Sequence, residues 1–69
     1  MDIIYKSVFD GVNDDITRIL DKYGVKYDRE NIFNNEMQLH ETKLTIHCKN
    51  TQTKTAVNHL IIALNQLAF

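Results

Sequence analysis

Residues 36–48 read EMQLHETKLTIHC, a stretch in which apolar and polar side chains alternate. Such alternation is typical of β-strands that turn one face to a core and the other to water. Pairing Leu39 with Leu44 across a loop at residues 40–43 would bring the apolar side chains to one face. The stretch therefore predicts a β-hairpin whose apolar face carries Met37, Leu39, Leu44, Ile46 and Cys48.

An amphipathic helix is predicted upstream, from about Asp2 to Tyr23. At about 100° per residue, its main apolar side chains fall within an arc of roughly 120°. They are Tyr5, Val8, Phe9, Val12, Ile16, Ile19, Leu20 and Tyr23. A strand is disfavoured at the start of this segment, because Ser7 would then share the apolar face. Poor helix formers at residues 10–14 predict either one helix kinked near Gly11 or two helices broken there.

The end of this helix carries a local stop signal. Gly24 is placed where a left-handed residue closes a helix, and Val25 can then pack back on Leu20. A short extra strand is expected near Val25–Asp28, and residues 31–35 are predicted to form a loop that leads into the hairpin.

A second amphipathic helix is predicted from about Thr51 or Gln52 to Leu67. Its capping residue is left open, because several polar side chains could serve: Asn50, Thr51 or Thr53. The expected core stripe consists of Val57, Leu60, Ile61, Leu64, Leu67 and Ala68.

These elements predict one compact α+β domain spanning residues 1–69, with the order α-β-β-α. The order comprises a long or kinked N-terminal helix, a β-hairpin and a C-terminal helix, with both helices on one face of the small sheet. Apolar residues make up 43% of the chain, charged residues 25%, and the net charge is −1. That balance is typical of a globular protein rather than a disordered one.

The apolar runs and the cysteine count indicate the cellular compartment in which the protein is expected. No apolar run approaches the roughly 18 residues of a membrane span, and no basic-then-apolar leader opens the chain. One cysteine excludes an internal disulfide and indicates either a reducing compartment or a protein that is indifferent to redox conditions. We therefore expect a cytoplasmic protein that does not enter the membrane.

Metal binding and catalysis are disfavoured by geometry. His47 and Cys48 are neighbours on a predicted strand and point to opposite faces, while His59 lies on another element. Glu36 would face His47 across the hairpin, which is an ordinary surface pair. Two glycines are too few for a phosphate-binding loop. We predict no metal site, no cofactor, no catalytic residues and no enzymatic activity.

Charge is distributed unevenly along the chain. Residues 1–35 hold seven acidic and five basic side chains, whereas residues 42–69 hold no acidic side chain and three lysines, Lys43, Lys49 and Lys54. Two of these lysines flank the start of the second helix, where backbone N–H groups can contact phosphate. A nucleic-acid-binding regulator that uses these lysines is the alternative function.

The second helix also carries apolar residues outside its core stripe. Ile62 lies about 100° from Ile61 around the helix, and a second stripe results, formed by Asn58, Ile62, Asn65 and Phe69. Ile3 and Ile4 similarly lie off the main arc of the first helix. A two-sided helix in a domain of only about two layers favours a partner on its second face.

We therefore predict a small intracellular protein-binding module, either a homodimer or an adaptor or inhibitor of a larger protein, with the second stripe as its binding surface. A structural subunit of a larger assembly would use the same stripe. Abundant Asn and Ile with no proline are typical of A/T-rich bacterial, phage or plasmid genomes. A phage- or plasmid-encoded inhibitor is the most specific form of this hypothesis.

Overall fold

The chain begins with a β-strand and not with the predicted helix. The computed structural model describes residues 1–68, without the side chain of Ala68. It contains β1 (Asp2–Ser7), α1 (Asp10–Lys22), β2 (Lys26–Asn34), β3 (Leu39–His47) and α2 (Thr51–Ala68). The α+β class with two helices is confirmed, but the order is β-α-β-β-α, so the predicted α-β-β-α order is wrong at its first element.

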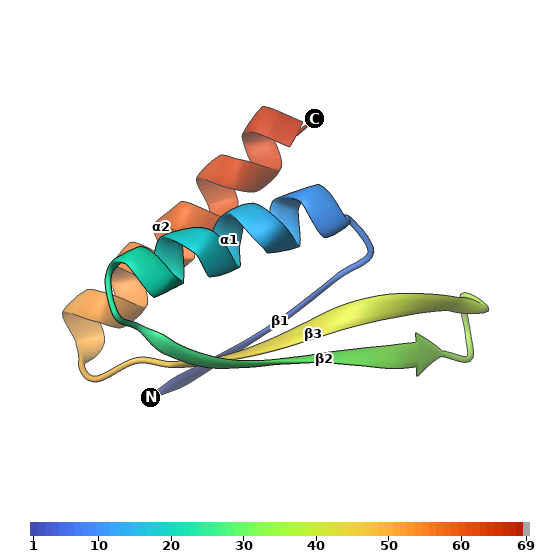
Figure 1. Ribbon diagram of the computed structural model, residues 1–69, viewed down its shortest axis with the longest axis horizontal. Coiled ribbons are helices and arrows are strands. Elements are labelled where there is room, and N and C mark those ends of the chain that lie inside the picture. The colour runs from blue at the N-terminus through green and yellow to red at the C-terminus, as the bar shows by residue number, and fades with distance from the viewer. Residues whose placement is uncertain (69) are drawn as a thin grey trace.

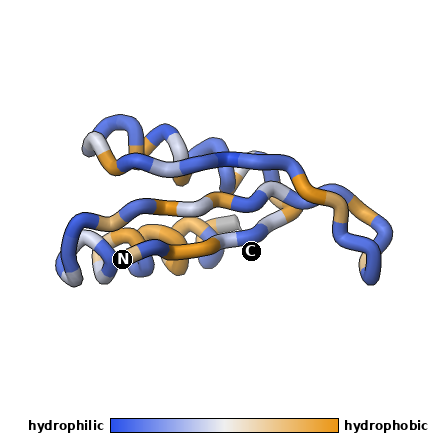
Figure 2. The backbone as a smooth tube through the Cα atoms, turned by 90° about the horizontal axis from the view of Figure 1, so that it is seen from below, coloured by the Kyte–Doolittle hydropathy of each residue, from blue (hydrophilic) through white to orange (hydrophobic). Residues whose placement is uncertain are grey.

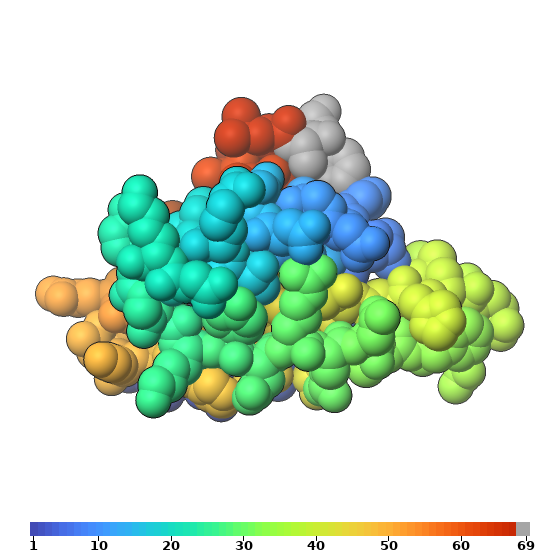
Figure 3. All heavy atoms as spheres, in the orientation of Figure 1, coloured from blue at the N-terminus to red at the C-terminus, as the bar shows by residue number. Residues whose placement is uncertain are grey.

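The three strands form one antiparallel sheet in the order β1-β3-β2. Because β1 and β2 both run antiparallel to β3, they are parallel to each other and α1 connects them. Both helices cover one face of the sheet, as predicted (Figure 1). The β2–β3 hairpin projects past the helices at its turn (Figures 1 and 3).

The prediction of a helix at the start of the chain is wrong, because a strand can place Ser7 on its apolar face. In the structure Ser7 is buried, and its polar groups are satisfied locally. Its hydroxyl accepts a hydrogen bond from the Phe9 N–H over 3.0 Å, and its carbonyl accepts one from the Asn13 amide over 3.3 Å. Residues 10–14, expected to kink or break the helix, instead form the start of α1.

The predicted hairpin is also wrong in its register. Residues 40–43, expected as a loop, lie inside β3, and Thr42 takes a buried position that was expected to be a turn. The turn is at residues 35–38, closed by the pairing of Asn34 with Leu39. Gln38 there has a φ of 56°. The short strand expected near Val25–Asp28 is the start of the nine-residue β2, which also absorbs the predicted loop at residues 31–35 as far as Asn34.

Both predicted helix boundaries that depend on local signals are confirmed. Gly24 has a φ of 70°, and the Val25 N–H donates to the Leu20 carbonyl over 2.9 Å, the bond that defines a Schellman motif. At the start of α2, the Asn50 side chain accepts a hydrogen bond from the Thr53 N–H over 2.8 Å. Asn50 is therefore the cap among the three candidates.

The core lies between the helices and the sheet. It is formed by Val12, Ile16, Leu20, Leu44, Ile46, Cys48 and Val57. The expected stripe of α2 is only partly correct, because Leu67 is 85% exposed and the side chain of Ala68 lies outside the described part of the structure. The other sheet face is open, and most of β2 is hydrophilic (Figure 2).

Candidate protein-binding surface

β1 is an edge strand whose backbone is paired on one side only. It pairs with β3 through Ile3 opposite Ile46 and Tyr5 opposite Leu44, and no other strand of residues 1–68 lies beside it. The Cys48 N–H donates to the Met1 carbonyl over 2.8 Å, which fixes the phase of this ladder. In an antiparallel ladder, residues that bond to the neighbouring strand alternate with residues whose N–H and C=O point away.

The outward backbone groups of β1 therefore belong to three residues. Because the Met1 backbone is bonded toward β3, the backbone N–H and C=O groups of every second residue after it also point toward β3. These residues are Ile3, Tyr5 and Ser7. The N–H and C=O groups of the intervening residues point to the outer side, and we call this set the β1 edge: Asp2, Ile4 and Lys6. Such a row is a template for pairing with another strand.

The side chains of the β1 edge all lie on the open face of the sheet. Their cross-strand neighbours on β3 are His47, Thr45 and Lys43, respectively. Ile4 is 61% exposed and stands between an acidic and a basic residue. Lys6 lies opposite Lys43, and like charges in that arrangement are unfavourable. Within residues 1–68 no carboxylate forms an ion pair with Lys6.

A hydrogen-bonded contact holds α2 above this edge. The Asn65 amide nitrogen donates to the Tyr5 hydroxyl over 2.9 Å and to the Ile61 carbonyl over 2.8 Å. The Tyr5 hydroxyl also lies 3.2 Å from the Asn65 side-chain oxygen. Because Tyr5 belongs to β1, the side of α2 that carries Asn65 is the side above the β1 edge.

The residues predicted from the second stripe lie along this side of α2. Asn58 and Ile62 precede Asn65 at helical spacing and therefore share its side of the helix, and Ile62 is 55% exposed. We call these three residues the α2 flank. Phe69, the fourth predicted residue, lies outside the described residues. Asn65 itself is half-buried and bonded within the chain, so it positions the helix rather than offering a free amide.

The other side of α2 packs toward α1. A groove between the two helices is lined on α1 by Ile19 and Leu20, and on α2 by Thr53, Ala56, Val57 and Leu60. The α2 flank and this groove are therefore on different sides of the helix. The flank is linked to β1 through the Asn65–Tyr5 hydrogen bond.

Sequence reasoning found the flank but missed the edge. The available signal was the run Ile3-Ile4-Tyr5, because β-branched and aromatic residues in succession favour a strand. The opposite charges of Asp2 and Lys6 at either end were a second signal that the helical interpretation left unused.

His47 links all three strands on the open face. Its Nδ1 lies 3.1 Å from an Asp2 carboxylate oxygen, and its Nε2 lies 2.9 Å from Asp28. The hydrogen bonds to Asp28 and then to Asp2 raise the pKa of His47 above its ordinary value of 6.5. The predicted pairing of Glu36 with His47 is wrong, because the residue of β2 that lies opposite His47 is Lys26.

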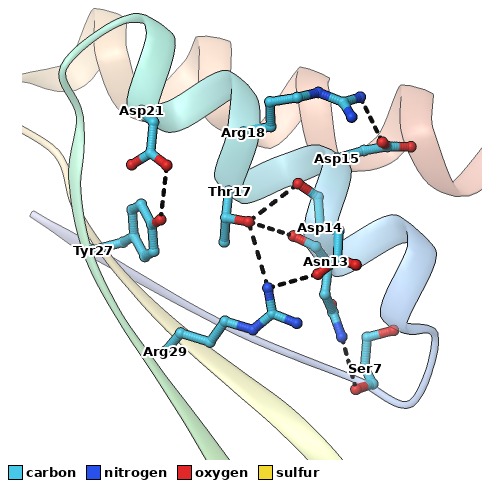
Figure 4. A network of polar contacts seen from close by, with 9 residues as sticks. All are labelled: Ser7, Asn13, Asp14, Asp15, Thr17, Arg18, Asp21, Tyr27 and Arg29. Carbon is cyan, nitrogen blue, oxygen red and sulfur yellow. Dashed lines mark hydrogen bonds and ion pairs between the residues drawn. The ribbon is translucent and has the colours of Figure 1, made fainter.

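A separate polar network fixes α1 on β2 (Figure 4). Arg29 lies 2.9 Å from the Asp14 carboxylate, and the Tyr27 hydroxyl donates to Asp21 over 3.2 Å. Burial, followed by the Asp21 hydrogen bond, raises the pKa of Tyr27. These contacts orient the helix above the sheet.

The alternative lysines occupy two different places. Lys43 lies on the open face of the sheet, 3.6 Å from Glu30. Lys49 and Lys54 lie around the N-terminus of α2 and are exposed. The structure therefore separates Lys43 from the other two rather than gathering three lysines on one helix end.

Metal-ligating side chains do not converge in the described part of the chain: residues 1–68 contain no group of three His, Cys, Asp or Glu residues placed to hold an ion. Neither helix, within the same residues, is long and apolar enough to cross a bilayer. Comparison of the chain with family models, with curated proteins and with solved structures found no match.

Proposed function

We propose that this chain is a small protein-binding module that pairs its β1 edge with a β-strand of a partner protein. The observation that carries the proposal is the coincidence of outward backbone groups, to which no strand of residues 1–68 pairs, with an exposed apolar side chain, Ile4, in their centre. Main-chain hydrogen bonds supply affinity in this mode of recognition, and side chains on alternate residues supply specificity.

The α2 flank adds an apolar contact next to the edge. A strand added beside β1 would extend the sheet beneath the overhanging side of α2, where Ile62 is exposed. Burial of a side chain of this size contributes about 1.5–3 kcal/mol when it is complete. With one such surface the module is suited to act as an adaptor or as an inhibitor of a larger protein.

Nucleic-acid binding is the less well supported function. Its three lysines are divided between two surfaces, and Lys43 is already paired with Glu30. Three lysines are also few against the roughly six to ten phosphate contacts of a firm binder. Replacing Lys49 and Lys54 by Gln would remove binding to DNA or RNA and its salt dependence if this function were correct.

The test of the protein-binding function is a selection from a displayed library of random peptides, carried out in parallel on the native protein and on Ile4→Pro. Proline removes the outward N–H of Ile4, which β3 does not use, so this edge substitution is compatible with the fold. Tyr5→Pro is the matched control, because it removes an N–H directed to β3 and should unfold the protein.

The proposal expects peptides with alternating apolar residues that bind the native protein and not Ile4→Pro. Ile62→Asp, on the exposed α2 flank, should weaken the binding of the same peptides. This variant keeps the test valid if circular dichroism shows that Ile4→Pro is misfolded. Peptides that bind all folded variants equally, or no selected peptide, would overturn the proposed function.

A further inference from the structure

We propose that the strand taken up by the β1 edge is β1 of a second copy of this chain, paired antiparallel so that Ile4 lies opposite Ile4 across a two-fold axis. This inference rests on the proposed function and names its partner. It follows from three properties of β1: the phase of its backbone groups, the order of its charges and the position of α2.

In this register the outward N–H and C=O groups of one β1 edge lie opposite those of the other. Residues directly opposite in a hydrogen-bonded antiparallel pair exchange both N–H···O bonds. With Ile4 opposite Ile4, Asp2 lies opposite Lys6 of the second copy, and Lys6 opposite Asp2. All three pairs join residues whose N–H and C=O already point outward, so each pair can form two hydrogen bonds without changing the ladder to β3.

The side chains of the open face match in the same register. Two Ile4 side chains meet at the axis, and an Asp2–Lys6 pair stands on each side of them. Opposite charges and apolar pairs in direct cross-strand positions are each favourable by roughly 0.2–1 kcal/mol. The second copy would thereby give Lys6 the carboxylate that it lacks within residues 1–68, where its neighbour is Lys43.

Other registers lose this match. The outward residues stay aligned only if the register shifts by two positions at a time. A shift in one direction places Asp2 opposite Ile4, and a shift in the other places Lys6 opposite Ile4, so a charge faces an apolar side chain and the Asp2–Lys6 pairs disappear. Parallel pairing of two β1 edges would need a two-fold axis along the strands, which would turn the helices and the Ile4 side chains of the two copies to opposite faces of the sheet.

The two-fold axis would also bring the two α2 helices together. An axis perpendicular to the sheet keeps all helices on the same face and forms a continuous six-stranded sheet from two three-stranded ones. The α2 flanks, held above β1 by Asn65 and Tyr5, then face each other across the axis. Ile62 would be covered by the second copy in this arrangement.

The test is a charge exchange, read as molar mass by size-exclusion chromatography with light scattering across a dilution series. The native protein should have a mass near twice 8.1 kDa. Asp2→Lys and Lys6→Asp, each alone, should place like charges opposite each other twice per dimer and weaken association by about tenfold or more. The double variant Asp2→Lys/Lys6→Asp should restore association, because opposite charges face each other again.

Circular dichroism and urea denaturation of each variant separate loss of pairing from loss of fold, and Lys54→Asp is the control for a charge reversal away from the edge. A native protein that is monomeric at every concentration would overturn the second-copy proposal but not the peptide-binding function. If the dimer persists in both single charge reversals but is lost in Ile4→Pro, the two β1 strands pair in another register, and only the proposed register is overturned. A dimer that is unaffected by any of these variants uses another surface and overturns the pairing.

Discussion

The side-chain amide of Asn65 donates a hydrogen bond to the hydroxyl of Tyr5 over 2.9 Å, across 60 positions of sequence. This bond joins the C-terminal half of α2 to the edge strand β1. It places the exposed side of the helix beside the outward backbone groups of the strand. This contact therefore links the two parts of the proposed binding surface.

Removing the Tyr5 hydroxyl should weaken both the fold and the surface. Tyr5→Phe leaves the half-buried Asn65 amide without one partner, which costs about 1 kcal/mol of unfolding free energy. Association should weaken as well, because α2 loses its position above β1. Urea denaturation measures the first effect and light scattering the second. Tyr27→Phe is the control, since its bond to Asp21 is exposed; equal losses in the two variants would contradict the account.

The two glycines should respond to alanine with opposite signs. Gly24 has a φ of 70°, so Gly24→Ala places a side chain in the left-handed region and destabilises the protein by about 1 kcal/mol. Gly11 lies in the first turn of α1 with open space around it, so Gly11→Ala should stabilise by up to about 1 kcal/mol. Thermal denaturation of both variants checks this, and a stabilised Gly24→Ala would be incompatible with the observed helix end.

His47 should make the fold more stable in mild acid. Its pKa is raised in the folded protein, so its stabilising contribution is complete below the unfolded pKa of about 6.5 and is lost as the pH rises through the folded value. The difference in unfolding free energy between the native protein and His47→Gln should therefore shrink as the pH increases. His59→Gln, at an exposed position of α2, is the control. A difference that grows with pH would refute the assignment.

Alanine substitutions of a core residue and of an exposed residue with similar hydrophobicity should have clearly different effects on the unfolding free energy. Ile46 is fully buried between the strands and the helices, so Ile46→Ala should cost about 2–5 kcal/mol. Leu67, expected in the core from helical spacing, is 85% exposed, so Leu67→Ala should change the unfolding free energy by less than about 0.5 kcal/mol. Urea titrations of the two variants check this, and a large cost at Leu67 would restore the original expectation.

The elements predicted correctly are those fixed by local interactions. Gly24 ends α1 and Asn50 begins α2 through hydrogen bonds to residues nearby in sequence, so the first boundary could be predicted and the cap of the second could be limited to three candidates. The strands depend on distant partners. Most residues of β2 are polar, and the segment forms a strand because β3 pairs with it along nine positions, a tertiary effect that overrides local propensity.

The residues of the proposed binding surface could be identified from the sequence only in part for the same reason. Ile62 and Asn58 follow from helical spacing alone. The strand that carries Ile4 was not predicted despite the run Ile3-Ile4-Tyr5, because the hydrogen bonds of Ser7 with Phe9 and Asn13 that permit a strand there are not visible in the residue pattern. The role of Asn65 depends on Tyr5, which no local pattern connects with it.

Hydrogen exchange at the backbone of β1 tests the central claim most directly. In a dimer paired through β1, the amides of Asp2, Ile4 and Lys6 should exchange as slowly as those of Ile3 and Tyr5. On dilution the first three should become fast while Ile3 and Tyr5 stay protected by β3. Rapid exchange of the Ile4 amide at every protein concentration, with Ile3 and Tyr5 protected, would contradict the pairing of two β1 strands.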